Sequence, residues 1–99
     1  MKRFSIITED LTKCIECGCN VNINKHEIFG GTAKRQLSIK YGLVIPLCGL
    51  FCHNQYDSIG IHFDSSLCEK WHKKGQIKAM QHYGWSKEDF IKIFGRSYL

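Results

Sequence analysis

The chain has 99 residues, a formal net charge of +5 and a pI near 8.9. This length predicts a single domain, residues 1–99, with a core so small that an additional cross-link is expected. The sequence has no apolar run long enough to cross a membrane, and its basic excess favours an acidic partner such as a nucleic acid.

The start of the chain and its six cysteines indicate a reducing compartment. A positively charged MKR is followed by an apolar run that stops at Thr8, which is too short for a secretory signal. We therefore expect a cytoplasmic protein without a membrane partner, whose clustered cysteines bind metal instead of forming disulfides. Weak alternation over residues 3–7 predicts a first strand.

A cysteine pair follows in the sequence CIECG, with Cys14 and Cys17 two residues apart. Two thiolates at this spacing can reach one zinc ion, and Gly18 allows the positive φ that such a tight turn needs. Cys19 is close enough along the chain to replace Cys17 in the same site.

Two segments predict a pair of strands. Residues 20–29 alternate polar and apolar side chains, as a half-buried strand does, and a glycine pair ends the segment at Gly30. Residues 43–47 form a short apolar strand, in which Pro46 favours an edge position or the strand end. The intervening basic segment, residues 32–42, is expected to be a long connection that could include a helical turn.

A second cysteine pair, Cys48 and Cys52, comes directly after this strand, where a helix is expected to begin. Together with Cys14 and Cys17 it would complete a tetrahedral, structural zinc site, although three residues separate the second pair instead of the usual two. Cys68 is expected to be a small buried hydrophobe on a later helix.

Two helices are predicted in the C-terminal part. The first covers residues 64–84, and the second covers residues 86–95 with Ser86 as its cap, Asp89 at its third position and Gly95 as its end. His72 and His82 are expected on the surface of the first helix. The predicted packing positions are Leu67, Trp71, Ile77, Met80 and Tyr83, and then Phe90, Ile91, Ile93 and Phe94.

Several stretches of the sequence resemble the HNH endonucleases, in particular a small phage and prophage type. The stretches are CIEC, HEIFGG, KRQLSIKYGLVIPLC, CHN, GIHF and DFIKIFGRSYL, which cover nearly the whole chain from Cys14. The resemblance implies an α+β fold of the ββα-metal (His-Me finger) type, in which a β-hairpin and a helix clamp a divalent ion. A four-cysteine zinc site would staple this core, and C-terminal helices would follow it.

The resemblance also implies roles for individual residues. His26, His53 and His62 would bind the catalytic divalent ion, which could be Mg²⁺, Mn²⁺ or Ni²⁺, and Asn54 would orient one of them. Glu27 stands where many members of the family have a histidine base, so either Glu27 or His26 would act as the general base. The asparagine that usually supports this base is replaced by Tyr41-Gly42.

The implied activity is metal-dependent hydrolysis of DNA, by nicking or double-strand cleavage with weak sequence specificity. A base would deprotonate water, and the ion would stabilise the leaving oxygen. Lys34, Arg35 and Lys40 would hold the DNA backbone. Phage recombination or packaging proteins in the bacterial host cytosol would be further partners.

Two alternatives without catalysis stay open. The same cysteines and basic residues would also suit a zinc-stabilised DNA-binding module, or an assembly module built on the same fold, because a fold does not determine a function.

Overall fold

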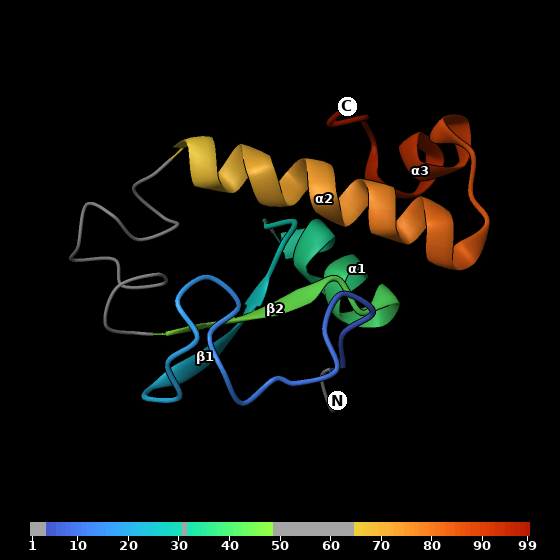
Figure 1. Cartoon of the computed structure of the whole chain (residues 1–99). Coiled ribbons are helices and arrows are strands. Elements are labelled where there is room, and N and C mark those ends of the chain that lie inside the picture. Colours follow the sequence, from blue (N-terminus) through green and yellow to red (C-terminus); the bar gives the residue numbers. More distant parts are fainter. Residues whose placement is uncertain (1–3, 31, 49–64) are drawn as a thin grey trace.

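The computed structural model describes residues 4–30, 32–48 and 65–99 (Figure 1). The fold is α+β, as predicted, with a two-stranded antiparallel sheet and three helices among these residues. None of the helices described is long and apolar enough to cross a membrane. In chain order the elements are β1 (Ile23–Glu27), α1 (Thr32–Tyr41), β2 (Val44–Cys48), α2 (Ser65–Tyr83) and α3 (Lys87–Phe94). The helix predicted directly after Cys48 lies outside the described residues.

The two strands pair over their whole length, with Ile23 opposite Cys48 and Glu27 opposite Val44. All five residues of β2 are buried, whereas β1 is partly exposed. Pro46 lies in an edge strand of this two-stranded sheet, as predicted, but it is fully buried. Its carbonyl accepts a hydrogen bond (2.9 Å) from the N–H of Ile15. The N-terminal segment therefore bonds to β2 at the position where proline has no N–H to offer.

The connection between the strands is a ten-residue helix, α1, so the prediction of a loop with at most a helical turn was wrong. The helix ends in a Schellman motif at Gly42, whose φ is +73°. The N–H of Leu43 bonds to the carbonyl of Ser38 (2.8 Å), and that of Gly42 to the carbonyl of Ile39 (3.4 Å). Among residues 33–41 of this polar helix, only Ser38 and Ile39 are buried, which explains why its sequence lacks a helical pattern.

The predicted strand over residues 3–7 is also absent: the described part of it, from Phe4 onward, contains no strand. The Ser5 hydroxyl oxygen accepts hydrogen bonds from the N–H groups of Ile7 (3.0 Å) and Thr8 (3.3 Å). A serine that bonds to nearby backbone in this way stabilises a turn in place of a strand.

Phe29 lies at the centre of the core, directly after β1, and is 0% exposed. Its ring centroid lies 4.9 Å from that of Phe94, 5.0 Å from that of Tyr98 and 5.6 Å from that of Phe90. The buried Ser38 hydroxyl accepts from the N–H of Phe29 (3.1 Å) and donates to its carbonyl (3.0 Å). Ser38 therefore fixes the Phe29 backbone to α1 while the ring packs against the C-terminal residues.

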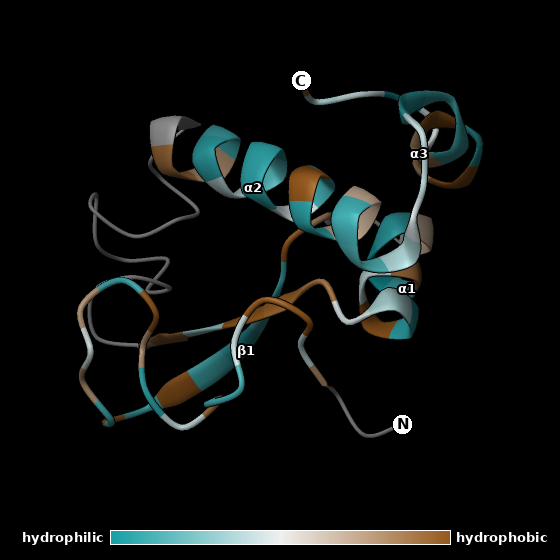
Figure 2. Cartoon of the chain, turned by 45° about the vertical axis from the view of Figure 1, so that its right-hand side comes forward, coloured by the Kyte–Doolittle hydropathy of each residue, from teal (hydrophilic) through white to brown (hydrophobic). Residues whose placement is uncertain are grey.

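Figure 2 shows α2 as mostly hydrophilic. Of its predicted packing positions, Trp71 is buried and Leu67, Met80 and Tyr83 pack against the core, whereas Ile77 does not. The contact face of α2 includes Trp71, Gly75 and Ala79, which are buried, whereas Ile77 is 43% exposed. A Cβ atom on Gly75 would lie 3.2 Å from Cγ2 of Ile28, so this glycine allows the helix to approach the residues after β1 closely.

The ends of α2 and α3 agree with the prediction. Gly84 follows α2 with a φ of +70°. At the start of α3, Ser86 and Asp89 form a reciprocal capping box, and at its end Gly95 adopts a left-handed conformation. Ile91, predicted to pack, is 37% exposed.

Candidate metal centre

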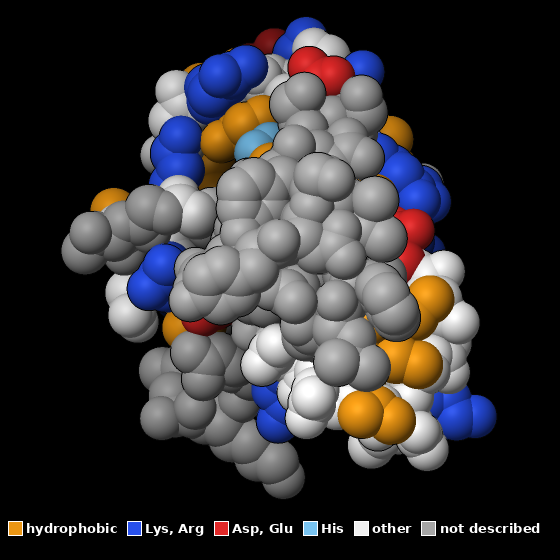
Figure 3. Space-filling model, turned by 90° about the vertical axis from the view of Figure 1, so that its left-hand side faces the viewer, with side chains coloured by type: hydrophobic (Ala, Val, Ile, Leu, Met, Phe, Trp, Pro, Cys, Tyr) orange, Lys and Arg blue, Asp and Glu red, His pale blue; other side chains and the backbone are white. Residues whose placement is uncertain are grey.

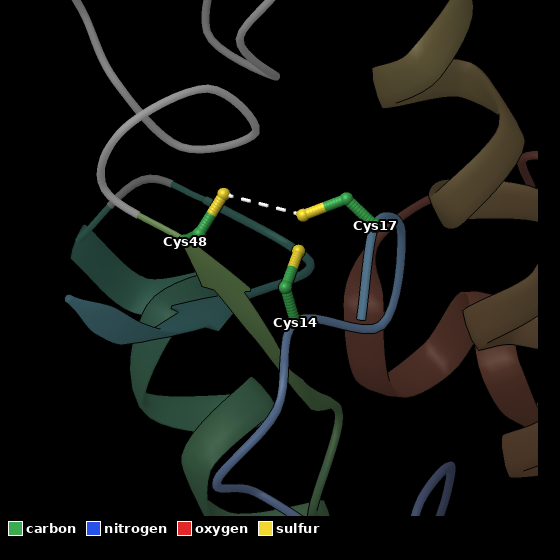
Figure 4. Close-up of side chains that lie close together, drawn as sticks. All are labelled: Cys14, Cys17 and Cys48. Atoms are coloured by element: carbon green, nitrogen blue, oxygen red, sulfur yellow. Dashed lines mark hydrogen bonds between the residues drawn. The ribbon is translucent and has the colours of Figure 1, made fainter. Parts of the chain in front are cut away.

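Three thiols converge beside the sheet: those of Cys14, Cys17 and Cys48 (Figure 4). Their sulfur atoms all lie within 4.8 Å of one another, and those of Cys17 and Cys48 are 3.6 Å apart. Of the His, Cys, Asp and Glu side chains in the described residues, these three form the one group close enough to hold an ion. Three sulfur ligands suit a tetrahedral zinc site that needs one further ligand.

The backbone of the N-terminal loop brings two of these thiols together. The N–H of Gly18, whose φ is +78°, bonds to the carbonyl of Cys14 (2.8 Å), and the N–H of Cys14 bonds to the carbonyl of Cys19 (2.7 Å). Ile15, which directly follows Cys14, donates the hydrogen bond to Pro46 of β2. The tight turn predicted from CIECG is thus present, and it is fixed next to the strand that carries Cys48.

A second anchor of this loop comes from Glu16, between the two cysteines. One of its carboxylate oxygens, Oε1, accepts hydrogen bonds from Nε1 of Trp71 (2.6 Å) and Nζ of Lys70 (2.9 Å), both on α2. This role of Glu16 is not predicted from the sequence, because its partners on α2 are more than 50 positions away. The loop is therefore held on one side by β2 and on the other by α2.

The neighbouring thiols influence the pKa of Cys17. A hydrogen bond from the backbone of Cys19 lowers its pKa, but sharing hydrogen bonds with the neighbouring thiols and desolvation together raise the pKa to about 11. Thiolates at these distances would repel one another, and a bound cation would provide the opposite charge that favours their ionisation. Three thiolates this close together would therefore be more stable with a metal ion bound than without one.

The two remaining described cysteines lie outside the group of three. Cys19 is a neighbour of Cys17, and its sulfur lies 3.9 Å from the carbonyl oxygen of Val21. Cys68 is partly buried against the core, and its sulfur lies 3.8 Å from Nε2 of His72. Burial raises the pKa of Cys68, as expected for a packed thiol.

Four of the predicted site residues lie outside the described residues: Cys52, His53, Asn54 and His62. His26 and Glu27 are described, and both are partly buried at the end of β1. His26 pairs with Ile45, three positions from Cys48, which corresponds to about 10 Å along a strand. The structure therefore separates His26 from the three clustered cysteines. The second, catalytic ion remains a prediction.

The three predicted DNA-binding residues all lie on α1. Arg35 and Lys40 are exposed, whereas Lys34 is partly buried and its Nζ donates to the hydroxyl of Tyr98 (3.2 Å). Because successive residues of a helix are rotated by about 100°, these side chains leave α1 in different directions. They do not form a single basic stripe along the helix.

The chain was compared with protein families, curated proteins and solved structures, and no family model, no curated protein and no solved structure matches it. The resemblance to HNH endonucleases therefore rests on the short sequence motifs alone.

Proposed function

We propose that the protein is a small metal-dependent DNA endonuclease of the HNH type, with a zinc ion that stabilises its hairpin. The observation that supports this most directly is the convergence of Cys14, Cys17 and Cys48 at one end of an antiparallel strand pair. Cys52 would provide the fourth thiolate. In a reducing cytosol a four-thiolate zinc site would cross-link the N-terminal loop to β2, which is the kind of support that a chain of this length needs.

The chemistry would take place at the other end of β1. There His26, with His53 and His62, would bind a second divalent ion, which would stabilise negative charge on the leaving oxygen of a phosphodiester. Asn54 would orient one of the histidines. The role of the protein itself would be to place a base next to the attacking water and to hold the DNA backbone with its basic side chains.

The strand geometry sharpens the choice of base. Successive side chains of a strand point to opposite faces, and β1 is regular through both His26 and Glu27. If His26 faces the ion, as proposed, Glu27 would point to the opposite face of the strand, and this favours His26 as the base. A histidine suits the base role because its reference pKa is near 6.5, whereas that of a glutamate is near 4.3.

Plasmid cleavage tests the proposal. Zinc-loaded protein should nick or cut plasmid DNA when Mg²⁺, Mn²⁺ or Ni²⁺ is added, and a chelator should stop the reaction. His53→Ala and His62→Ala should each reduce the rate by orders of magnitude while the zinc content stays unchanged. His82→Ala is the matched control, because His82 is an exposed histidine of α2 and should be silent. Equal background nicking by all of these proteins would refute the nuclease.

Substitutions at the end of β1 then identify the base. If Glu27 is the base, Glu27→Ala should lower the rate by roughly 10²- to 10⁴-fold, and Glu27→His should retain or raise it. If His26 is the base, His26→Ala should abolish cleavage and Glu27→Ala should cost much less.

One observation favours the alternative of a zinc-stabilised DNA-binding module without catalysis. Tyr41 stands where the resemblance leads one to expect an asparagine, and its ring packs edge-on against Trp85 (4.9 Å between centroids) and Tyr83 (5.5 Å). This position therefore has a structural role. The module would bind duplex DNA with a strong salt dependence and would not cut it under any of the metal conditions.

A further inference from the structure

A hollow of about 220 Å³ lies between α2 and the residues that follow α3. None of the three clustered cysteines lines it. Figure 3 shows Lys and Arg side chains near the top of one face of the molecule, next to hydrophobic side chains and a histidine. Three residues of α2 and two of the C-terminal segment line the hollow: Glu69, His72, Lys73, Arg96 and Tyr98.

The two walls are fixed to each other by Gln76, whose side chain is 0% exposed. Its Oε1 accepts a hydrogen bond from the N–H of Tyr98 (2.6 Å), and its Nε2 donates to the hydroxyl of Ser97 (3.0 Å). A buried amide bonded in this way holds the C-terminal segment on α2 in a defined position. The shape of the hollow is therefore fixed by buried hydrogen bonds.

Two cations line the hollow, Lys73 and Arg96, and a third, Lys34, lies against Tyr98, which forms part of its wall. Lys73 comes from α2, Arg96 from the C-terminal segment and Lys34 from α1. Over the ring of Tyr98, the guanidinium carbon of Arg96 lies 4.7 Å from the centroid and Nζ of Lys34 lies 5.7 Å from it. A solvated lysine face on one helix would not explain this convergence of distant residues.

The remaining charges around the hollow leave a positive balance. Glu69 is the acidic residue among those that line it. The pKa of His72 is lowered, first by desolvation and then by the positive charges of Arg96 and Lys34, although a hydrogen bond to the Ile28 backbone and the charge of Glu69 oppose this. With Lys73 and Arg96 against Glu69, the charged side chains that line the hollow favour an anion.

We propose that this hollow binds a phosphate group, with Arg96 and Lys73 as its main ligands. Guanidinium groups bind phosphate through paired hydrogen bonds, and a lysine adds a point charge. The phosphate belongs either to the 5′ end of a nucleic acid strand or to a free phosphate monoester. Binding of a 5′ end rests on the proposed function, because it assumes that the protein acts on DNA. The phosphate site itself does not require that the protein cuts DNA.

Binding is measured on the zinc-loaded full chain by calorimetry, and by NMR of the His72 ring, with three probes. These are inorganic phosphate, an oligonucleotide with a 5′ phosphate and the same oligonucleotide with a 5′ hydroxyl. The 5′ phosphate should improve the affinity by about tenfold over the hydroxyl, which corresponds to one strong charged contact. The bound dianion should also raise the pKa of His72.

Three variants with equal changes in charge test the assignment. Arg96→Gln and Lys73→Gln should each remove most of the advantage of the 5′ phosphate. Lys78→Gln is the control, because Lys78 lies on the same helix but lines a different hollow, beside Ile7 and Trp71. Glu69→Gln should do the opposite and tighten binding, since it removes the acidic charge next to the phosphate.

The outcomes separate the two sources and the two proposals. Binding of inorganic phosphate without an advantage for the 5′ phosphate would assign the site to free phosphate monoesters. Equal weakening by Arg96→Gln and Lys78→Gln would show a general charge effect, and no effect of Glu69→Gln would mean that the phosphate does not bind beside Glu69. Either result would overturn the site. If plasmid cleavage fails but the preference for the 5′ phosphate persists, the proposed nuclease activity is refuted and the phosphate site is not.

Discussion

The two ends of the hairpin are held by different chemistry. At one end, where Ile23 pairs with Cys48, three thiols gather and the neighbouring Val21 is 50% exposed. At the other end, β1 continues into Ile28 and Phe29, which are buried under α2 and the C-terminal residues. The buried aromatic rings of this short chain therefore gather at one end of the hairpin, and its converging thiols lie at the other.

The two ends also differ in how their backbone is organised. The thiol end is built from turns, with glycine in a left-handed conformation and few residues in regular elements. Turns of this kind bury little surface, so a metal cross-link would contribute most there. The aromatic end is built from helices with well-formed caps, and its stability comes from packing.

Removing a thiol should have the largest effect. Cys14→Ser should lower the zinc content and unfold the thiol end, because structural zinc sites of this type contribute on the order of 10 kcal/mol. Zinc content is measured by elemental analysis, and folding by hydrogen exchange of the amides in β1 and β2. Cys68→Ser is the control and should leave the zinc content unchanged. Folded wild-type protein without zinc would contradict the prediction.

Removing the Phe29 ring should have the next largest effect on stability. Phe29→Ala removes the ring around which the other aromatic side chains pack, and such a change costs about 3–5 kcal/mol in a buried core. Urea unfolding of the zinc-loaded protein measures this cost. Phe4→Ala, at a position that is 46% exposed, is the matched control and should cost much less. Equal costs for the two variants would show that Phe29 is not the centre of the core.

The attachment of Phe29 to α1 can be weakened at Ser38. Ser38→Ala would leave the buried N–H and carbonyl of Phe29 without the hydroxyl that now bonds to both. The expected loss in the free energy of unfolding is about 1–3 kcal/mol, the usual cost of an unsatisfied buried polar group. Gln36→Ala, at an exposed position of the same helix, should change stability by no more than about 0.5 kcal/mol. A neutral Ser38→Ala would mean that water replaces the hydroxyl.

The same contrast explains what the sequence could predict. The ends of α3 follow from Ser86, Asp89 and Gly95, and the turn of the cysteine loop from Gly18, because each depends on residues close together along the chain. Three members of the proposed zinc site were predicted for a similar reason, since cysteine spacing is a local signal.

Features that depend on distant parts of the chain could not be predicted. The helix α1 is polar, and its packing depends on Ser38 reaching Phe29. Gln76 gives no sign in the sequence that it is buried, because its role requires the C-terminal segment to lie on α2. The anchoring of Glu16 by Trp71 has the same cause, as these residues are 55 positions apart.

The smallest expected effect concerns acid sensitivity at the start of α3. Hydrogen bonds from the backbone and the hydroxyl of Ser86 lower the pKa of Asp89 below its reference value near 3.9. A carboxylate with a lowered pKa in the folded state adds stability above its unfolded pKa, and this stability is lost as the pH falls through the folded pKa. The contribution of Asp89 should therefore be complete at neutral pH and decline from about pH 4 downward.

Asp89→Asn measures this contribution directly. The variant should be slightly less stable than wild type at neutral pH, and the difference should shrink in acid, where the wild-type carboxyl becomes protonated as well. Glu88→Gln is the charge-matched control, because Glu88 lies in the same first turn but takes no part in the capping box. Acid also protonates cysteine ligands and so releases metal, and for this reason each variant is compared with wild type at the same pH and zinc content. A stability difference that stays constant between neutral pH and pH 3 would show that the capping box does not sense the charge of Asp89.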